Sequence, residues 1–561
     1  MSTVRRVFFY ILALVTLGIM AIGLWNLLSL SFDAILSGFT LAQVGDIKPR
    51  LSLGIAMVVI GAPLWFLFWG AIQRHAEHEA DEAGSALRAF SLNIILIVFA
   101  FLISLNLEVL LKWMIAGFSS DQFSPGSTAT LIVSAIVWCF YWRISEKEGY
   151  PTPVAKTVRR WYIYILSISG LIWLSFGLVQ IANSAFISLP IWQGDVVGGS
   201  FWNNGTRSNI SWVLVGGLVW AFYWFYAARD DVGSSLRQVY YYLLTILGGA
   251  IAGLTALTFT LYLVFYWLMG GERDVAGYFQ FLGWAIPTIL VAFCIWFYHL
   301  RLAEEESAEE QQHSLSARRL HYYLMSFLGL GTLIAGLIVI LGIPLDWAIN
   351  TLKPETIVLE PGWWNHHLSL GIAMLAVSIP VWLLYWSRII DSTEKGGVDE
   401  RSARSRRIYL YVIIGASVVM LAADLVNIVY QLLNGILAGN LGVETLRNMQ
   451  WSLQTVFIAV PVLIYHLQIA KQDQKLGSEV AAARKNVTLL VGDKKSPIIS
   501  LVEQKLGYKV RTAQYVGEWA GGLPALSDAE IEQLVSQVKT SVANNVMLVL
   551  IEGHSMVLPY K

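Results

Sequence analysis

The sequence predicts an all-α polytopic membrane protein with about twelve transmembrane helices, arranged as six tandem hairpins and followed by a small C-terminal cytoplasmic α/β domain. Three observations support this fold class. The 561 residues are 56% hydrophobic and only 14% charged, whereas a soluble chain carries about 25% charged residues. Apolar stretches long enough to cross a bilayer recur along the chain. A two-helix motif also repeats, which indicates tandem duplication.

The apolar stretches are predicted to be helices, because an open strand would leave backbone groups unsatisfied in lipid. They cover residues 7–30, 51–71, 90–111, 128–144, 161–184, 209–228, 239–269, 279–300, 322–343, 367–387, 408–433 and 449–468. The loops on one side carry 20 lysines and arginines, and those on the other side only 7 (Lys48, Arg50, Lys112, Arg207, Arg273, Lys353 and Arg447). By the positive-inside rule we expect both termini in the cytoplasm.

The odd-numbered spans begin with a recurrent basic and aromatic motif. It reads RRVFFY from Arg5, RRWYIY from Arg159, RQVYYY from Arg237, RRLHYY from Arg318 and RRIYLY from Arg406, with a degraded copy at Arg88. We expect these arginines to extend toward lipid phosphates while the aromatic rings lie at head-group depth.

The even-numbered spans end in pairs of tryptophans on one helix face. The pairs are Trp65 and Trp69, Trp138 and Trp142, Trp220 and Trp224, and Trp382 and Trp386. We expect them to be interfacial anchors; a base- or quinone-stacking platform is the alternative. The heptapeptide LSLGIAM precedes two of these pairs, at 51–57 and 368–374, and Pro63, Pro380 and Pro461 are predicted to kink three even spans.

These motifs divide the chain into six hairpins and a tail. Every hairpin begins and ends on the same side, so the copies are parallel and not inverted repeats. The predicted domains are 1–75, 86–147, 157–230, 235–303, 316–390 and 404–470 for the hairpins, and 471–561 for the tail.

Few polar residues fall within the spans. Asp424 is the deepest ionisable residue, about 25 Å from Arg407 at 1.5 Å per residue. Asn427, Asn26, Glu108 and Gln180 each follow the last motif arginine by the same interval. We expect helix–helix hydrogen bonds at these positions, with a polar pathway as the alternative. Glu108 can also pair with Lys112 at i+4.

Metal, haem and catalytic sites find no support in the residue pattern. The nine histidines fall at span ends, in loops or in the tail, which disfavours two axial haem ligands inside the bundle. His299 and His466 occupy equivalent Tyr-His-Leu positions, where a pigment or metal ligand is the less favoured interpretation. We predict no catalytic residues, no metal and no cofactor, but expect bound lipid.

The tail has soluble patterning from about Lys471. Strands are predicted at 487–491, within 508–516 and at 546–551, with a helix from Ser496-Pro497 to Gly507 and another that Ser527 and Glu530 cap. The βαβαβ order favours a small parallel α/β unit. The loop VGDKKS lacks a phosphate-loop motif, so a nucleotide site is disfavoured. The acidic run from Glu304 to Glu310 is expected to be solvated.

The repeats resemble a bacterial multi-pass membrane family of two-helix domains of unknown function. The resemblance rests on RR-x-x-Y-x-Y at odd helices and on P-x-W-x-x-x-W at even ones, and extends to LLVGD and LPALSDAEIEQL in the tail. It implies a prokaryotic plasma-membrane protein and supplies no catalytic residues.

The favoured function is therefore a non-catalytic structural, assembly or accessory component of a membrane complex, or a self-assembling scaffold. We expect its partners to be the lipid bilayer, other membrane proteins or further copies of itself, and not nucleic acid, since the net charge is zero. The alternatives are a transporter or channel for a small solute, and a membrane sensor that signals through the tail.

Overall fold

The computed structural model describes residues 3–37, 41–78, 84–119, 122–190, 201–271, 275–309, 311–352, 362–483, 485–491, 497–506, 509–514, 528–541, 543–551 and 554–560. Contacts divide the chain into two compact units. The first comprises Met1–Ile389 and Asn427–Gln454, and the second comprises Ile390–Val426 and Thr455–Lys561.

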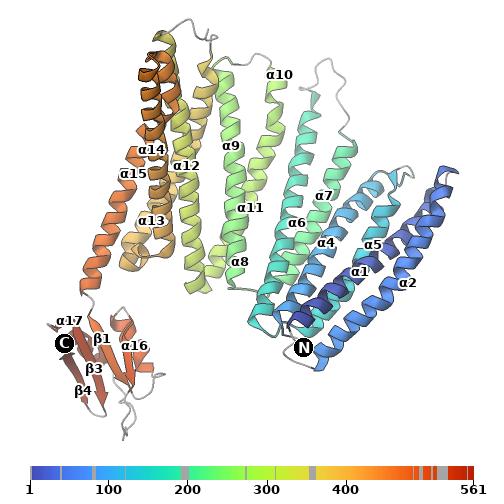
Figure 1. Ribbon diagram of the computed structural model, residues 1–561, viewed down its shortest axis with the longest axis horizontal. Helices are drawn as coiled ribbons and strands as arrows, with labels where there is room; N and C mark the ends of the chain where they lie inside the picture. Colours follow the sequence, from blue (N-terminus) through green and yellow to red (C-terminus); the bar gives the residue numbers. More distant parts are fainter. Residues whose placement is uncertain are drawn as a thin grey trace. The chain divides into compact units, whose positions relative to one another are not determined.

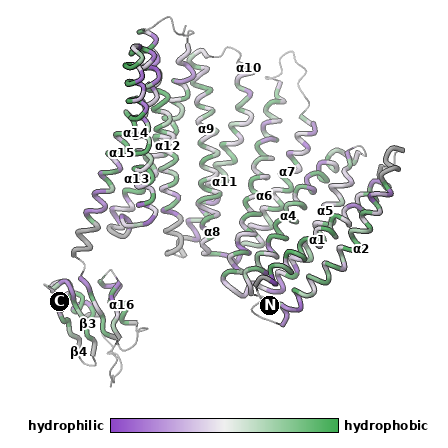
Figure 2. Tube along the Cα trace, in the orientation of Figure 1, coloured by the Kyte–Doolittle hydropathy of each residue, from purple (hydrophilic) through white to green (hydrophobic). Residues whose placement is uncertain are grey.

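The protein is a polytopic helical membrane protein, as predicted. Twelve spans within the described residues are long and apolar enough to cross a membrane, and Figure 2 shows hydrophobic residues along them. The helices that form them are α1 (Thr3–Phe32), α2 (Leu41–His78), α4 (Ala86–Ile115), α5 (Pro125–Glu148), α6 (Pro153–Ile187), α7 (Asn204–Ala221), α8 (Ser235–Val239), α9 (Leu247–Leu268), α11 (Leu282–Glu309), α12 (Gln311–Leu352), α13 (Trp364–Arg401), α14 (Arg404–Leu437) and α15 (Val443–Ala483).

Short π- and 3₁₀-helical segments join or extend these helices. They are η1 (Asp33–Ser37), η4 (Phe222–Ala227), η5 (Tyr240–Ile246) and η6 (Phe279–Phe281), and α10 (Val275–Tyr278) is a single turn. The wider π-helical turn η5 carries three consecutive tyrosines, Tyr240 to Tyr242, that are all almost fully buried. An ordinary helical turn would direct three successive side chains to different sides, so the surrounding helices must enclose this turn.

Consecutive helices of the first unit pair as hairpins, and each hairpin touches the next (Figure 1). Within hairpins, α1 contacts α2, α4 contacts α5, α6 contacts α7, and α9 contacts α11; between hairpins, α1 contacts α5, α4 contacts α6, α6 contacts α11, and α8 contacts α12. This is a row in chain order. At least two thirds of each span's most apolar window is not buried, since the buried share is 17–33%, so these helices offer wide apolar surfaces to lipid or partners.

Glycines allow the two helices of a hairpin to touch backbone to backbone. A Cβ atom added at Gly170 in α6 would lie 2.5 Å from the amide nitrogen of Trp220 in α7. A Cβ atom at Gly329 in α12 would lie 2.9 Å from the amide nitrogen of Trp382 in α13. Small residues are the usual means by which membrane helices approach so closely.

The prolines of the spans lie inside helices, and α13 is interrupted only after its proline, at Gly397 (φ 56°). Pro63 lies in α2, Pro380 in α13 and Pro461 in α15. Pro287 in α11 and Pro344 in α12 also lie within helices. A kink at the three even-span prolines stays a prediction.

The tail forms the predicted parallel α/β unit with one additional strand. Its elements are β1 (Asn486–Val491), α16 (Pro497–Leu506), β2 (Arg511–Gln514), α17 (Asp528–Thr540), β3 (Asn545–Ile551) and β4 (His554–Tyr560). The sheet order is β2-β1-β3-β4, and β4 is an antiparallel edge strand that the pattern did not predict. Ser496, Gly507, Ser527 and the VGDKKS loop after Val491 lie outside the described residues.

One apolar core joins the sheet and both helices of the tail. Leu489 and Leu548 of the central strands are buried together with Val502 of α16 and Val538 of α17. On the surface, Lys505 donates to Glu532 over 2.5 Å and lowers the pKa of that carboxyl.

Candidate functional site

Three of the five buried Arg, Asp and Glu side chains in the described residues are motif arginines at the starts of their helices, and we call this end of a span the basic end. Arg88, Arg237 and Arg406 are 0%, 6% and 4% exposed. Each begins the first helix of the second, fourth or sixth hairpin. Each also pairs with a carboxylate near the end of the other helix of that hairpin, and we call these pairs the arginine clamps.

The clamp of Arg237 is the most extensively bonded. Its Nε and Nη2 donate to the two oxygens of Glu306 over 2.9 and 2.6 Å. Nη1 donates to the carbonyl oxygen of Ala228 over 2.7 Å, and Tyr241 donates its hydroxyl to Glu306 over 2.7 Å. The guanidinium also lies 4.8 Å from the Trp224 ring centroid. Such a two-pronged, charge-assisted pair fixes orientation as well as distance.

The clamp of Arg88 repeats this arrangement with different partners. Its Nε donates to Glu148 over 2.8 Å, and Nη2 contacts the other oxygen of that carboxylate. Nη2 also donates to Gln73 over 2.8 Å, while Nη1 lies 3.4 Å from the Tyr10 hydroxyl. The Trp69 ring centroid is 5.7 Å from the guanidinium.

The third clamp lies in the second unit. Arg406 donates from Nε to Asp473 over 2.5 Å and from Nη2 over 3.2 Å. Arg401 adds a second guanidinium, 3.2 Å from the same carboxylate. One acidic residue therefore serves two arginines here.

N-cap serines fix the helix starts that carry two of these arginines. Ser85 and Ser234 are the N-caps of α4 and α8, and their hydroxyls accept from the amides of Arg88 and Arg237 over 3.2 and 3.1 Å. An N-cap serine fixes the first helical turn, so the arginine three residues later projects from a defined position.

A buried aromatic or imidazole side chain precedes each clamp carboxylate by two helical turns. Tyr141, His299 and His466 are each 1% exposed and lie seven residues before Glu148, Glu306 and Asp473. Residues spaced by seven share a helix face. Each of the three hairpins therefore repeats the clamp together with a buried ring two helical turns before its carboxylate.

His299 lies within a cage of aromatic rings. Its ring centroid is 5.7, 5.9 and 6.3 Å from those of Tyr240, Trp224 and Tyr241. Nδ1 lies 2.8 Å from the Ile295 carbonyl oxygen, and Nε2 has no hydrogen-bond partner among the described residues. His466 repeats the carbonyl contact, with Nδ1 2.8 Å from Val462.

Metal-binding geometry is not found around these histidines. Within the described ranges, no group of three or more His, Cys, Asp and Glu side chains is placed to hold a metal ion.

The tryptophan pairs contact protein rather than facing outward. Trp65, Trp69, Trp224 and Trp386 are buried, and Trp138, Trp142, Trp220 and Trp382 are half-buried. Trp65 donates to the Tyr141 hydroxyl over 3.1 Å, and Trp224 donates to that of Tyr298 over the same distance. Neighbouring helices cover the four buried indoles. The role of the pairs as interfacial anchors stays a prediction.

Two expectations about charge at the basic end are wrong. Arg88, Arg237 and Arg406 do not extend toward head groups, because carboxylates on the adjacent helix bind them inside the protein. Glu306, expected to be solvated within the acidic run, has a side chain only 12% exposed. Sequence reasoning also missed Glu148 and Asp473, although the seven-residue interval after Tyr141 and His466 was visible.

Four of the five polar pathway candidates lie in the first unit, and hydrogen bonds do not join them to one another. In the described part of that unit, no hydrogen bond or ion pair links any two of Asn26, Glu108, Gln180 and Asn427; Asp424 lies in the second unit. Glu108 is buried and accepts from Ser208 of α7 over 2.6 Å, instead of pairing with Lys112.

Two other candidates also bond to neighbouring groups. Asn427 donates to Ser452 over 2.9 Å. Asn26 is buried and donates to the Ile22 carbonyl of its own helix over 3.3 Å. Gln180 is half-buried. Asp424 is 7% exposed, and its Oδ2 has no partner among the described residues.

A family model described as a domain of unknown function, DUF5671, matches residues 6–124, 160–278 and 319–446. The chain belongs to this family. Each DUF5671 match begins at the second arginine of a pair, at Arg6, Arg160 or Arg319, and contains one hairpin and the first helix of the next. The three clamp arginines thus recur once in each DUF5671 copy. Neither a curated protein nor a solved structure matches the chain.

Proposed function

We propose that this protein is a non-catalytic structural, assembly or accessory component of a membrane complex, or a self-assembling scaffold. One observation carries the proposal: the charges buried among the spans join helices. Of five buried Arg, Asp or Glu side chains in the described residues, Arg88, Arg237 and Arg406 form clamps and Glu108 bonds to Ser208. Asp424 is the exception. Such a design stabilises a row of hairpins that presents wide apolar faces to partners.

The direct test is the mass of the intact particle after gentle extraction. The chain itself weighs 62.5 kDa, so native mass spectrometry from nanodiscs separates a lone monomer from an assembly. We expect a particle containing several copies or a second protein. A lone monomer with solute uptake that Asp424→Asn abolishes would overturn the proposal.

A transporter is the second candidate, because Asp424 is buried with one carboxylate oxygen lacking a described partner. Ionisable residues within spans often mark solute or ion paths. Uptake assays in proteoliposomes, comparing wild type with Asp424→Asn, separate this candidate from the scaffold.

We also propose a bacterial plasma-membrane location with both termini in the cytoplasm. The excess of basic residues at the basic end supports this orientation. Fusing a compartment-sensitive reporter to each terminus tests it, and reporters on opposite sides would contradict it.

A further inference from the structure

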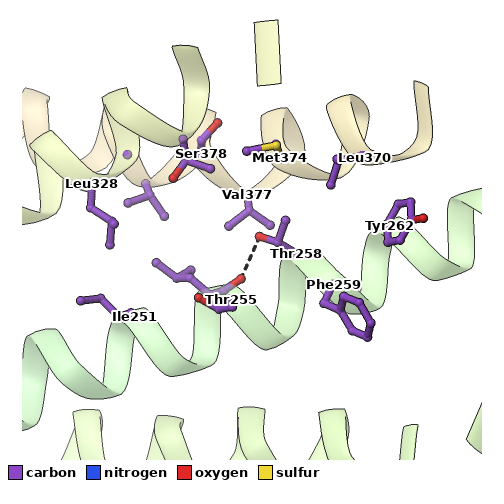
Figure 3. A pocket seen from close by; sticks show the side chains of 14 residues that line it. Ile251, Thr255, Thr258, Phe259, Tyr262, Leu328, Leu370, Met374, Val377 and Ser378 are labelled. Atoms are coloured by element: carbon purple, nitrogen blue, oxygen red, sulfur yellow. Dashed lines mark hydrogen bonds between the residues drawn. The ribbon is translucent and has the colours of Figure 1, made fainter. Parts of the chain in front are cut away.

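A cavity of about 300 Å³ lies between α9, α12 and α13 of the first unit (Figure 3). Apolar side chains form most of its wall, among them Ile251 and Leu254 of α9, Leu328 of α12, and Leu370, Met374 and Val377 of α13. Thr258 donates its hydroxyl to the Leu254 carbonyl over 2.8 Å, whereas the Ser378 hydroxyl in the wall has no hydrogen-bond partner among the described residues.

The cavity lies between the second and third DUF5671 copies, and the boundary between the first and second copies is filled by aromatic rings. There, α4 contacts both α6 and α7. The Phe101 and Trp173 ring centroids are 5.6 Å apart, and those of Trp173 and Trp212 are 5.5 Å apart.

The corresponding positions at the cavity carry smaller or more flexible side chains. Phe101 lies 13 residues after Arg88, and Ala250 lies 13 after Arg237. Trp173 lies 13 residues after Arg160, and Thr332 lies 13 after Arg319. Trp212 precedes Trp220 by 8 residues, as Met374 precedes Trp382. Thr332 and Met374 both line the cavity.

The polar link across the filled boundary is also replaced. Glu108 follows Arg88 by 20 residues, as Leu257 follows Arg237. Ser208 precedes Trp220 by 12 residues, as Leu370 precedes Trp382. The hydrogen bond between α4 and α7 therefore has no polar counterpart, and Leu370 lines the cavity. The mostly apolar wall favours an apolar ligand in this space.

Water is a poor occupant of such a space, because a buried water needs two to four polar partners. An empty void is also unfavourable, since its wall loses dispersion contacts. The lining residues belong to predicted spans, so the surrounding solvent is hydrocarbon. A lipid chain is the molecule that the membrane itself supplies.

One end of the cavity becomes polar where α9 ends and α13 begins. Tyr262 lines the cavity, and its hydroxyl lies 2.8 Å from Nδ1 of the exposed His366. Tyr266 stacks on the same imidazole with ring centroids 3.9 Å apart. A mostly apolar cavity with a phenol and an imidazole at one end matches an amphiphile whose apolar chain lies along the helices.

We propose that this cavity binds the acyl chain of a bilayer phospholipid, whose head group lies beside Tyr262 and His366. The copies of the family unit thus differ in function: one boundary is closed by its own aromatic rings, and the next is completed by lipid.

Photolabelling tests the proposal on the full chain in nanodiscs that contain a phospholipid with a diazirine in its acyl chain. In the wild type we expect labels on α12 near Leu328 and on α13 near Met374. Thr332→Trp restores the ring found at Trp173 and should lower this labelling about tenfold. Leu218→Trp, at a 62% exposed position outside the cavity, is the matched control and should leave it unchanged.

If Thr332→Trp misfolds, which loss of a monodisperse elution peak would show, a second variant tests the same proposal. Met374→Trp fills the cavity from the opposite wall and should also lower labelling, whereas Thr332→Val retains the volume and should preserve it. Equal labelling of wild type and a folded tryptophan variant overturns the proposal. Labelling by a diazirine isoprenoid alcohol that excess phospholipid does not displace overturns the assignment to an acyl chain.

Water access provides an independent readout. Ser378 lines the cavity and is 1% exposed, so Ser378→Cys reports on the interior after the native Cys139 and Cys294 are changed to serine. Resistance to a membrane-impermeant thiol reagent supports a lipid-filled site. Rapid modification overturns it in favour of a hydrated pathway.

Discussion

Arg237 on α8 and Glu306 on α11 are 69 residues apart in sequence, and Nη2 donates to Oε1 over 2.6 Å with both side chains at most 12% exposed. The pair joins the start of one helix to the end of its hairpin partner. Because it is buried, its contribution depends on both partners: losing one charge leaves the other desolvated and uncompensated.

Replacing Arg237 with methionine should therefore lower the free energy of unfolding by about 3 kcal/mol. The loss arises because Glu306 would remain buried without its counterion. Thermal unfolding of the detergent-solubilised protein, followed by circular dichroism, measures the change as a lower midpoint.

Arg229→Met is the matched control, because the pair of Arg229 with Asp230 is 64% and 86% exposed and should contribute about 0–1 kcal/mol. The double variant Arg237→Met, Glu306→Leu should recover much of the loss, since it removes both buried charges. Equal midpoints for the two single variants would show that the clamp does not stabilise the hairpin.

Replacing Arg88 with lysine should lower the thermal stability of the protein. A lysine keeps the charge but lacks the planar fork that reaches Glu148 and Gln73 together. We expect a lower unfolding midpoint for Arg88→Lys, smaller in effect than for Arg88→Met. Arg74→Lys, at an exposed position, should leave the unfolding midpoint unchanged. An equal fall in the midpoint for Arg74→Lys would show that the clamp geometry of Arg88 is not the cause.

Gly216 and Gly217 are adjacent in α7 but have different surroundings. A Cβ atom at Gly216 would lie 2.7 Å from the carbonyl oxygen of Gly170, whereas one at Gly217 would be 3.9 Å from the nearest atom, Leu174 Cδ1. Gly216→Ala should destabilise the α6–α7 hairpin by about 1–3 kcal/mol through overpacking. Gly217→Ala should be neutral in the same thermal assay, so indistinguishable variants would contradict the backbone contact.

Asp424→Asn should leave stability unchanged or raise it, because it removes a buried charge whose Oδ2 has no described partner. Glu108→Ala is the contrasting variant, since it strands the Ser208 hydroxyl and should cost about 1–3 kcal/mol. A marked loss of stability in Asp424→Asn would mean that this carboxylate holds helices together like the clamps.

The order and number of the spans were predictable because each depends on a local property. Twenty successive apolar residues suffice to select a helix in lipid, and the repeated arginine and tryptophan motifs revealed the hairpins. The βαβαβ tail was equally readable from its alternating strands and amphipathic helices. Strand β4 was missed, because Pro559 is unusual in a strand and only pairing with β3 stabilises this edge strand.

The residue sequence by itself determined the solvent of this protein, the number of its spans and its repetition, since hydropathy and spacing are properties of short segments. Tertiary structure alone decided that Arg88, Arg237 and Arg406 bind carboxylates instead of lipid, and that four of the eight paired indoles at even-span ends are buried. These outcomes depend on which side chain of another helix lies within about 3 Å, and a carboxylate some 60–70 residues away leaves no local signal for a buried hydrogen bond.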